Sequence, residues 1–138
     1  MQPRDEAPEL CSILLVDDQE LFRRLARVLL SSHPGLKVVG EAGTGEEALS
    51  LVASLKPQAV VLDVQLPDMS GFEAAWRMLD AHPELKVIIT SGYDFQYSAL
   101  AKSVGAAGFL AKRKFSAEAV ARALGLGSTS DSAAGAER

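Results

Sequence analysis

The sequence contains few of the residues that would tie it to disulfides or zinc. Its 138 residues include one cysteine, Cys11, which cannot form an intramolecular disulfide. A lone cysteine is typical of the reducing cytoplasm, and we expect Cys11 to be a small apolar residue that opens a strand. A CxxC pair and a histidine pair at four-residue spacing are both missing, so the sequence predicts no zinc site.

Long apolar runs and strong positive charge are also missing. No stretch approaches the roughly 20 apolar residues that span a bilayer, and the start, MQPRDEAPEL, resembles neither a signal nor a transit peptide. The net charge of −4 and the absence of a long basic run argue against direct binding of nucleic acid. The GxxxxGK[ST] and GxGxxG phosphate loops do not occur. We therefore expect a cytoplasmic protein that binds neither membrane nor nucleic acid directly.

Five short apolar runs predict the strands of a sheet. Three of them are nearly continuous in valine, isoleucine and leucine, which is typical of parallel strands buried on both faces. The runs are CSILLV (11–16), LKVVGEA (36–42), AVVLDV (59–64), LKVIIT (85–90) and GFLA (108–111).

Segments with helical spacing alternate with these runs, at 19–31, 44–55, 71–81, about 94–104 and 117–124. Thr44 with Glu47 forms a capping-box pattern, and Ser116 is a candidate N-cap. The predicted apolar stripes are Leu21, Leu25, Val28 and Leu29 in the first helix, Phe72, Ala75, Trp76 and Leu79 in the third, and Tyr97, Leu100, Ala101 and Val104 in the fourth.

The alternation of strands and helices predicts an α/β fold with right-handed crossovers and a doubly wound parallel sheet. We expect this domain to cover residues 11–124. Residues 1–10 are predicted to be a flexible N-terminal segment. Residues 125–138, rich in glycine, serine and alanine, are predicted to be a disordered tail.

Polar residues follow the predicted strands at the edge where such sheets bind ligands. Asp17 and Asp18 follow the first strand, Asp63 comes near the end of the third, Thr90 ends the fourth and Lys112 follows the fifth. A carboxylate after a fully apolar run costs desolvation unless something binds it. Three carboxylates in one pocket also repel each other unless a cation joins them, and oxygen ligands favour Mg²⁺.

Each residue also has a structural interpretation. Asp18 could be only a helix N-cap, Thr90 only a β-branched strand residue and Lys112 only a surface lysine. Their convergence at one edge favours chemistry instead, because a lysine and a hydroxyl are the groups that bind a phosphoryl group. The set fits phosphoryl transfer onto Asp63.

Over residues 11–124 the sequence resembles the receiver domain of bacterial two-component response regulators. The matching segments are ILLVDDQ, VVLDVQLPDMSG, KVIITSG and GAAGFLAKRKF. The resemblance implies a flavodoxin-like (βα)5 fold with sheet order 2-1-3-4-5. It also implies a phosphoacceptor signalling domain, not an enzyme, that assists its own phosphorylation and dephosphorylation. The phosphoryl donor would be a histidine kinase or a phosphotransfer protein, and the cofactor Mg²⁺ or Mn²⁺.

The resemblance also assigns roles to residues. Asp63 would be the phosphoacceptor, and Lys112 would pair with a phosphoryl oxygen. Thr90 would hydrogen-bond another oxygen, and Phe109 would follow Thr90 inward as the switch aromatic. The implied metal ligands are Asp17, Asp18, Asp63 and the backbone carbonyl of Gln65.

Two positions depart from the family pattern. Arg113 stands where proline is common, so the turn after Lys112 is expected to differ, and Phe109 replaces the commoner tyrosine. The candidate partner-docking residues are Phe22, Tyr93, Phe95, Arg113 and Lys114. For the three aromatic residues, packing in the core is the alternative.

Other functions compete with this interpretation. A phosphohydrolase of the haloacid-dehalogenase type needs an acid two residues after its nucleophile, where this chain has Gln65. A flavin binder would need a first loop without the acids of DDQELF. A receiver-like module that acts without phosphorylation stays open. We expect a single-domain regulator with an unidentified downstream partner. A homodimer, and a receiver cut from a longer regulator with a helix-turn-helix output, also stay open.

Overall fold

The computed structural model describes residues 10–92 and 98–126, and these ranges form one parallel sheet covered by helices on both faces. The strands are β1 (Cys11–Val16), β2 (Leu36–Ala42), β3 (Ala59–Asp63), β4 (Lys86–Ser91) and β5 (Gly108–Ala111). The helices are α1 (Glu20–Ser31), α2 (Gly45–Leu55), α3 (Gly71–Ala81), α4 (Ser98–Ser103) and α5 (Ala117–Ala123), with a 3₁₀ turn, η2, at Lys112–Lys114.

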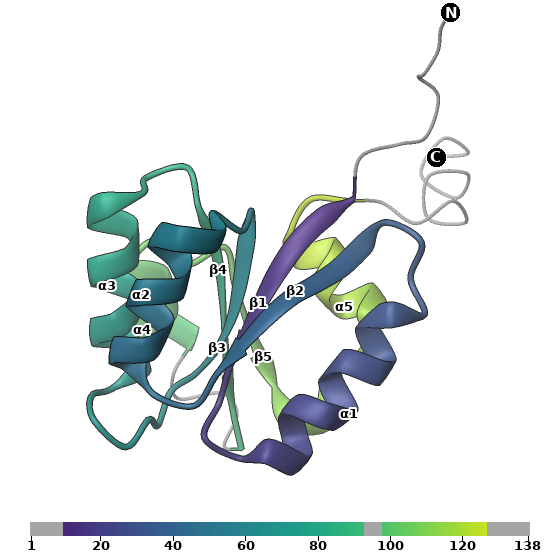
Figure 1. Cartoon of the computed structure of the whole chain (residues 1–138), viewed down its shortest axis with the longest axis horizontal. Coiled ribbons are helices and arrows are strands. Elements are labelled where there is room, and N and C mark those ends of the chain that lie inside the picture. The colour runs from purple at the N-terminus through teal and green to yellow at the C-terminus, as the bar shows by residue number, and fades with distance from the viewer. Residues whose placement is uncertain (1–9, 93–97, 127–138) are drawn as a thin grey trace, which may run out of the picture.

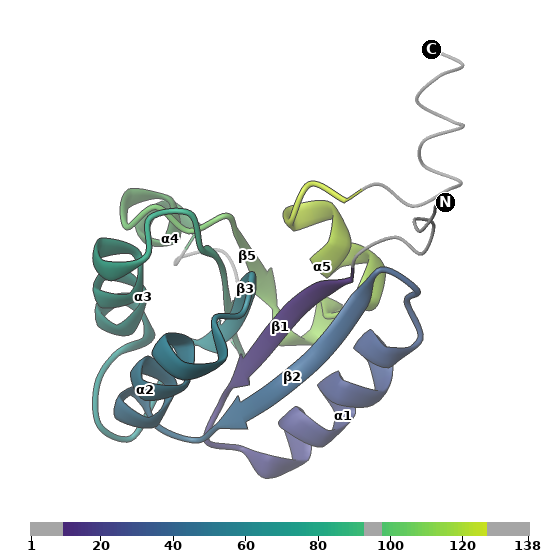
Figure 2. The same cartoon turned by 45° about the horizontal axis from the view of Figure 1, so that its top comes forward.

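The sheet has the order β2-β1-β3-β4-β5, with all pairs parallel. Figure 1 shows α2, α3 and α4 on one face of the sheet and α1 and α5 on the other, and Figure 2 shows the same layers from another side. The predicted fold class and strand order are therefore confirmed.

The central strands explain why both faces need helices. Alternate side chains of a strand point to opposite faces, so Leu14 and Leu62 join the core under α2 and α3. Ile13 and Val61 join the second core, under α1 and α5. Every residue of β3 is buried, which carries Asp63 into the interior at the end of the strand.

The helix caps that the sequence predicts at Thr44 and Ser116 are present in the structure. Thr44 Oγ1 accepts a hydrogen bond from the backbone N–H of Glu47 at 3.1 Å, and Ser116 Oγ accepts one from Ala119 at 3.0 Å. The fourth strand begins and ends one residue later than predicted, so Thr90 lies inside β4, with Ser91 at its end. The predicted start of the fourth helix, with Tyr97, lies outside the described residues, as do the docking candidates Tyr93 and Phe95.

The predicted inner face of α1 is wrong for three of its four residues, since only Leu29 packs against the core. Leu21, Leu25 and Val28 are 76%, 53% and 66% exposed, while Ala26 and Leu30 are fully buried. The helix carries two apolar stripes, and the small side chain of Ala26 lets the second one approach the sheet closely. Of the other predicted stripe residues, Trp76 and Leu100 are also exposed, whereas Ala75 and Ala101 are buried as expected.

The end of α5 is closed by backbone hydrogen bonds. Gly125 has a φ of +82°, and the N–H of Leu126 donates to the carbonyl of Ala121 at 2.8 Å, a turn that favours glycine. Most of the predicted flexible segments lie outside the described residues, so those segments remain predictions. Within the described ranges, none of the helices is long and apolar enough to cross a membrane.

Candidate functional site

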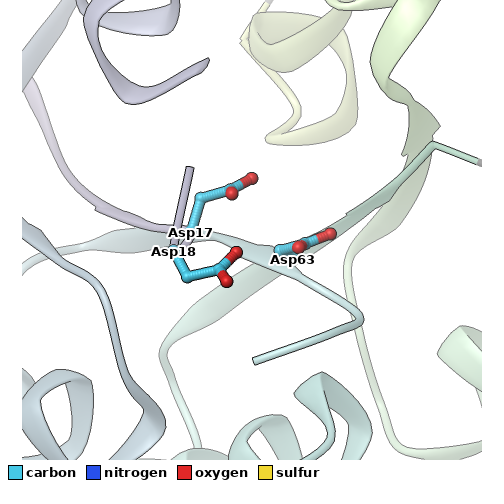
Figure 3. Close-up of side chains that lie close together, drawn as sticks. All are labelled: Asp17, Asp18 and Asp63. Atoms are coloured by element: carbon cyan, nitrogen blue, oxygen red, sulfur yellow. The ribbon is translucent and has the colours of Figure 1, made fainter. Parts of the chain in front are cut away.

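Three aspartates lie together at the carboxyl edge of the sheet (Figure 3). Asp17 and Asp18 follow β1, and Asp63 ends β3; one ligand oxygen from each lies within 4.8 Å of the others. Asp17 and Asp63 are buried, while Asp18 is exposed. The predicted convergence of these carboxylates is thus present in the structure.

Backbone contacts fix the loop that carries Asp17. Its N–H donates to the carbonyl of Ala42 in β2 at 3.0 Å, and its own carbonyl accepts from Arg23 Nη1 at 2.6 Å. Arg23 is itself held by Glu41, whose Oε1 lies 2.9 Å from Nε. The hydrogen bond from Arg27, followed by that from Arg23, holds the pKa of Glu41 below its ordinary value, so Glu41 keeps its charge beside Arg23.

Gly71 explains the spacing between Asp63 and the following helix. A Cβ at this position would overlap the carbonyl oxygen of Asp63 and lie 2.8 Å from Val64 Cα, so only glycine lets α3 start against the end of β3. Asp68 in the same loop accepts hydrogen bonds from the N–H groups of Gly45 and Glu46 at 2.8 and 2.9 Å. The loop after Asp63 is therefore tied to the first turn of α2.

Lys112 reaches back over the pocket from the end of β5. Its Nζ lies 2.7 Å from Asp17 Oδ2 and 3.7 Å from Asp63 Oδ1. It donates a hydrogen bond to Gln19 Oε1 at 3.1 Å and lies 4.7 Å from the centroid of the Phe22 ring. The lysine that the sequence predicts at this edge is thus in contact with the acids.

Thr90 lies beside Asp63, because the two residues are register partners in β3 and β4. The Thr90 side chain is 0% exposed, and its hydroxyl has no hydrogen-bond partner among the described residues. A buried polar group without a partner costs about 1–3 kcal/mol. This hydroxyl is therefore available to a ligand on Asp63.

The electrostatics of the pocket are unfavourable for its own carboxylates. Burial, followed by the charge of Asp17, raises the pKa of Asp63 to about 6. Lys112 and the backbone N–H of Gln65 oppose this rise without cancelling it. Carboxylate oxygens that repel one another across a short distance are suitable ligands for a hard divalent cation, so the residues present fit Mg²⁺.

The remaining predicted residues lie around this centre. Gln65 lines a cavity of about 470 Å³ together with Asp18, Asp63 and Lys112. Phe109 is half-buried in β5 and packs against the core under α2, α3 and α4.

The docking candidates are divided between core and surface. Arg113 and Lys114 are exposed in η2, the turn that stands where family members often have proline. Phe22 is half-buried and packs in the core on the α1 side, which agrees with its alternative interpretation.

Sequence reasoning missed three contacts of the site. It did not predict that Gln19 binds Lys112, that Arg23 holds the Asp17 carbonyl, or that Asp68 binds α2. The only available signal was at Gln19, where a residue that rarely caps helices occupies the N-cap of α1.

A doubly wound sheet with an acidic pocket and a lysine at its carboxyl edge defines a receiver-type domain. Comparison with known families supports this directly, since the response regulator receiver domain matches residues 13–124. The chain belongs to the response regulator receiver domain family. Members of this family are signalling domains of two-component systems, are characteristically phosphorylated on aspartate, and bind Mg²⁺ at an acidic pocket.

Individual relatives agree with the family. Response regulator GacA of Pseudomonas syringae pv. syringae is 38% identical over 112 residues, 80% of this chain and 52% of the relative. The chain thus spans about half the length of the curated relatives it matches. The receiver domain of NarL from Mycobacterium tuberculosis has a TM-score of 0.76 and 32% identity, covering 86% of this chain and 96% of that one.

A second solved structure is a response regulator from Burkholderia pseudomallei with a phosphorylated aspartic acid, a calcium ion and citrate. It has a TM-score of 0.72 and 27% identity, and the match covers 91% of this chain and 71% of that one.

Proposed function

We propose that this chain accepts a phosphoryl group on Asp63 from a histidine kinase or a histidine phosphotransfer protein, in a reaction that depends on Mg²⁺. The observation that carries the proposal is the buried Asp63 carboxylate, with Lys112 Nζ at 3.7 Å and, on the adjacent strand, the Thr90 hydroxyl, which has no partner in the part of the chain that the structure describes. The phosphorylated aspartate of the Burkholderia pseudomallei relative supports it.

The chemical step is a displacement at phosphorus. An oxygen of Asp63 attacks the phosphorus of a phosphohistidine, and the O–P bond forms as the P–N bond breaks. The electron pair of the broken bond stays on the imidazole nitrogen, which then binds a proton. Asp17, Asp18, Asp63 and the carbonyl of Gln65 would hold Mg²⁺, which when bound supplies positive charge to the phosphoryl oxygens.

The phosphoryl group then changes what the pocket attracts. It adds roughly −1.5 to −2 charges, which draw the Lys112 ammonium and a hydrogen bond from the Thr90 hydroxyl. Thr90 and Phe109 lie on neighbouring strands, where Thr90 is paired with Leu110 and Ile89 with Phe109. Movement of Thr90 toward Asp63 frees space for the Phe109 ring and changes the face formed by α4, β5 and α5. A coupling of about 1–3 kcal/mol suffices for such a switch.

Receiver domains interact with histidine kinases and downstream effectors. For the phosphodonor, we propose the exposed apolar stripe of α1, Leu21, Leu25 and Val28, as the docking surface. It begins close to Asp18, and apolar side chains gathered on one exposed helix face mark interaction sites. The exposed Arg113 and Lys114 border the same pocket edge through Lys112 and contribute to the choice of partner. The downstream partner is a protein bound through α4, β5 and α5.

The competing functions differ in measurable ways. A phosphohydrolase is disfavoured by Gln65, which cannot protonate a leaving group. A phosphorylation-independent module would bind its partner without modification. A single-domain arrangement and a cytoplasmic location remain predictions.

The deciding experiment is intact-mass analysis after incubation with a small phosphodonor, with and without Mg²⁺, for the wild type and Asp63→Asn. We expect one Mg²⁺-dependent phosphate adduct in the wild type and none in the variant. Absence of an adduct in the wild type, including under rapid quench, would refute the proposal in favour of the phosphorylation-independent module.

A further inference from the structure

The Lys112 ammonium contacts two side chains that have no role in the proposed phosphoryl transfer. Besides Asp17 and Asp63, it contacts Gln19 Oε1 at 3.1 Å and the face of the Phe22 ring, with 4.7 Å to the ring centroid. Its side chain is only 17% exposed. A lysine has a flexible four-carbon stem that allows its ammonium several positions, and these contacts favour the position observed beside the two acids.

The Phe22 ring is itself held in place. Its centroid lies 5.3 Å from that of Phe115, with an interplanar angle of 72°. Phe115 is buried in the core on the α1 and α5 side of the sheet. The ring of Phe22 is thus anchored on the protein side and offers a negatively polarised face to the ammonium.

The side chain of Gln19 binds Lys112 and does not cap its own helix. It is the N-cap of α1, yet its side chain makes no capping hydrogen bond. The N-cap residues of the other long helices, Thr44 and Ser70, both cap through their side chains. Glutamine is a weak N-cap, and here its amide oxygen accepts from Lys112 instead.

We propose that Phe22 and Gln19 are positioning residues, which hold the Lys112 ammonium beside Asp63 before a phosphoryl group arrives and thereby set the rate of phosphoryl transfer. The inference rests on the proposed function of Asp63. A cation that is already in place when negative charge develops needs no reordering in the transition state. Phe22 contributes more than Gln19, because the contact with the Gln19 amide is exposed to water.

The test replaces Phe22 with phenylalanines that carry one, two or three ring fluorines. These keep the shape of the ring but progressively weaken the negative charge of its face. With a small phosphodonor and saturating Mg²⁺, the rate of phosphorylation of Asp63 is expected to fall stepwise, by about two- to tenfold over the series, as for a partly buried cation–π contact. The small donor removes any effect of α1 on kinase docking.

The matched control is the same fluorination of Phe115. This residue shares the ring pair with Phe22 but has no cation over its ring in the described part of the chain. In the fluorinated Phe115 variants, we expect the rate of Asp63 phosphorylation to stay at the wild-type value. Gln19→Leu removes the amide acceptor and is expected to slow the reaction about two- to threefold, with an unchanged thermal midpoint.

A second readout follows Lys112 in the resting protein. The Cε protons of a lysine held over a ring face show an upfield ring-current shift in NMR spectra, and we expect that shift to be reduced in Phe22→Leu. A wild type that accepts no phosphoryl group refutes the proposed function. A wild type that is phosphorylated, with a flat fluorine series, a faster Phe22→Leu variant or an unshifted Lys112 resonance, overturns the positioning role alone.

Discussion

The two ends of the sheet differ in whether their polar groups have hydrogen-bond partners. At the amino end, Ser12 and Gln58 satisfy each other: the N–H of Ser12 donates to Gln58 Oε1, and the N–H of Gln58 donates to Ser12 Oγ, both at 3.0 Å. Lys86 closes the same end by donating to the carbonyl of Leu124 at 3.1 Å. The side chains at this end therefore stabilise the fold by pairing with backbone groups.

At the carboxyl end, buried carboxylates lie close to one another and a buried hydroxyl lacks a hydrogen-bond partner among the described residues. Asp63 and Asp17 are buried close to each other, and the Thr90 hydroxyl is buried without a partner in the described residues. Such groups cost stability, and they persist at sites where a ligand completes them. The two ends therefore differ in how far their polar groups are paired, although the amino end also borders the larger cavity, of about 1060 Å³. Each prediction below tests this difference.

The largest effect is expected from Gly71→Ala, which attacks the join between β3 and α3. The added Cβ would collide with the Asp63 carbonyl and the Val64 backbone, neither of which can rotate away. We expect the free energy of unfolding to fall by about 3 kcal/mol and phosphorylation to be lost with the loop geometry. Urea denaturation measures the first. Gly92→Ala is the control, because, apart from the adjoining residues, no atom of residues 10–92 or 98–126 is found within 4 Å of a Cβ there; equal behaviour of the two variants would contradict the steric explanation.

Asp63→Asn is expected to stabilise the metal-free protein at neutral pH. The folded pKa of about 6 exceeds the ordinary value of 3.8, so the wild type loses stability as pH rises from about 4 to 6 and does not regain it above. The variant lacks this loss, so its free energy of unfolding should exceed that of the wild type by about 1–3 kcal/mol at pH 7 and should be similar below pH 4.

Denaturation curves across this pH range in a chelator measure the difference between the two proteins. Mg²⁺ at a hundredfold excess over its dissociation constant should add about 2.7 kcal/mol to the wild type and narrow the gap. Ser12→Ala, at the amino end, should instead lose about 1 kcal/mol at every pH. An Asp63→Asn variant that is less stable than the wild type at pH 7 would remove the basis of the comparison.

Thr90→Val separates stability from signalling. The substitution keeps the shape of the side chain and removes a hydroxyl that has no partner among the described residues, so the free energy of unfolding should rise by up to about 1 kcal/mol. Asp63 should still be phosphorylated, but the affinity of the phosphorylated protein for its output partner should fall to that of the unphosphorylated protein. Titration of both forms with the partner measures this; retained phosphate-dependent affinity would show that Thr90 is not the switch.

The sequence allowed prediction of those features that depend on local pattern. The apolar run before Asp63 predicted a buried strand with a carboxylate at its end, and Thr44 with Glu47 predicted the start of α2. Both follow from residues a few positions apart. The order of strands and the meeting of Asp17 with Asp63 followed from the general geometry of parallel sheets and from resemblance to the family.

Contacts between distant segments could not be predicted in this way. Two apolar stripes on α1 fit helical spacing equally well, and only the space beneath the helix selects Ala26 and Leu30 over the stripe of Leu21. The bond between Gln19 and Lys112 joins residues 93 positions apart, which no periodicity reports. Such contacts depend on side-chain packing at the end of folding.

The smallest effect is expected from Gln19→Ser, which removes a side-chain contact with Lys112 at the carboxyl end of the sheet and adds a helix cap in its place. Serine at the N-cap of α1 can accept a hydrogen bond from the first turn, which glutamine does not, so thermal or urea denaturation should show a gain of about 0.5–1 kcal/mol. The same change removes the acceptor of Lys112, so phosphorylation by a small donor should slow about two- to threefold. A variant that gains stability without losing rate would mean that the N-cap of α1 is free of the functional constraint inferred for it.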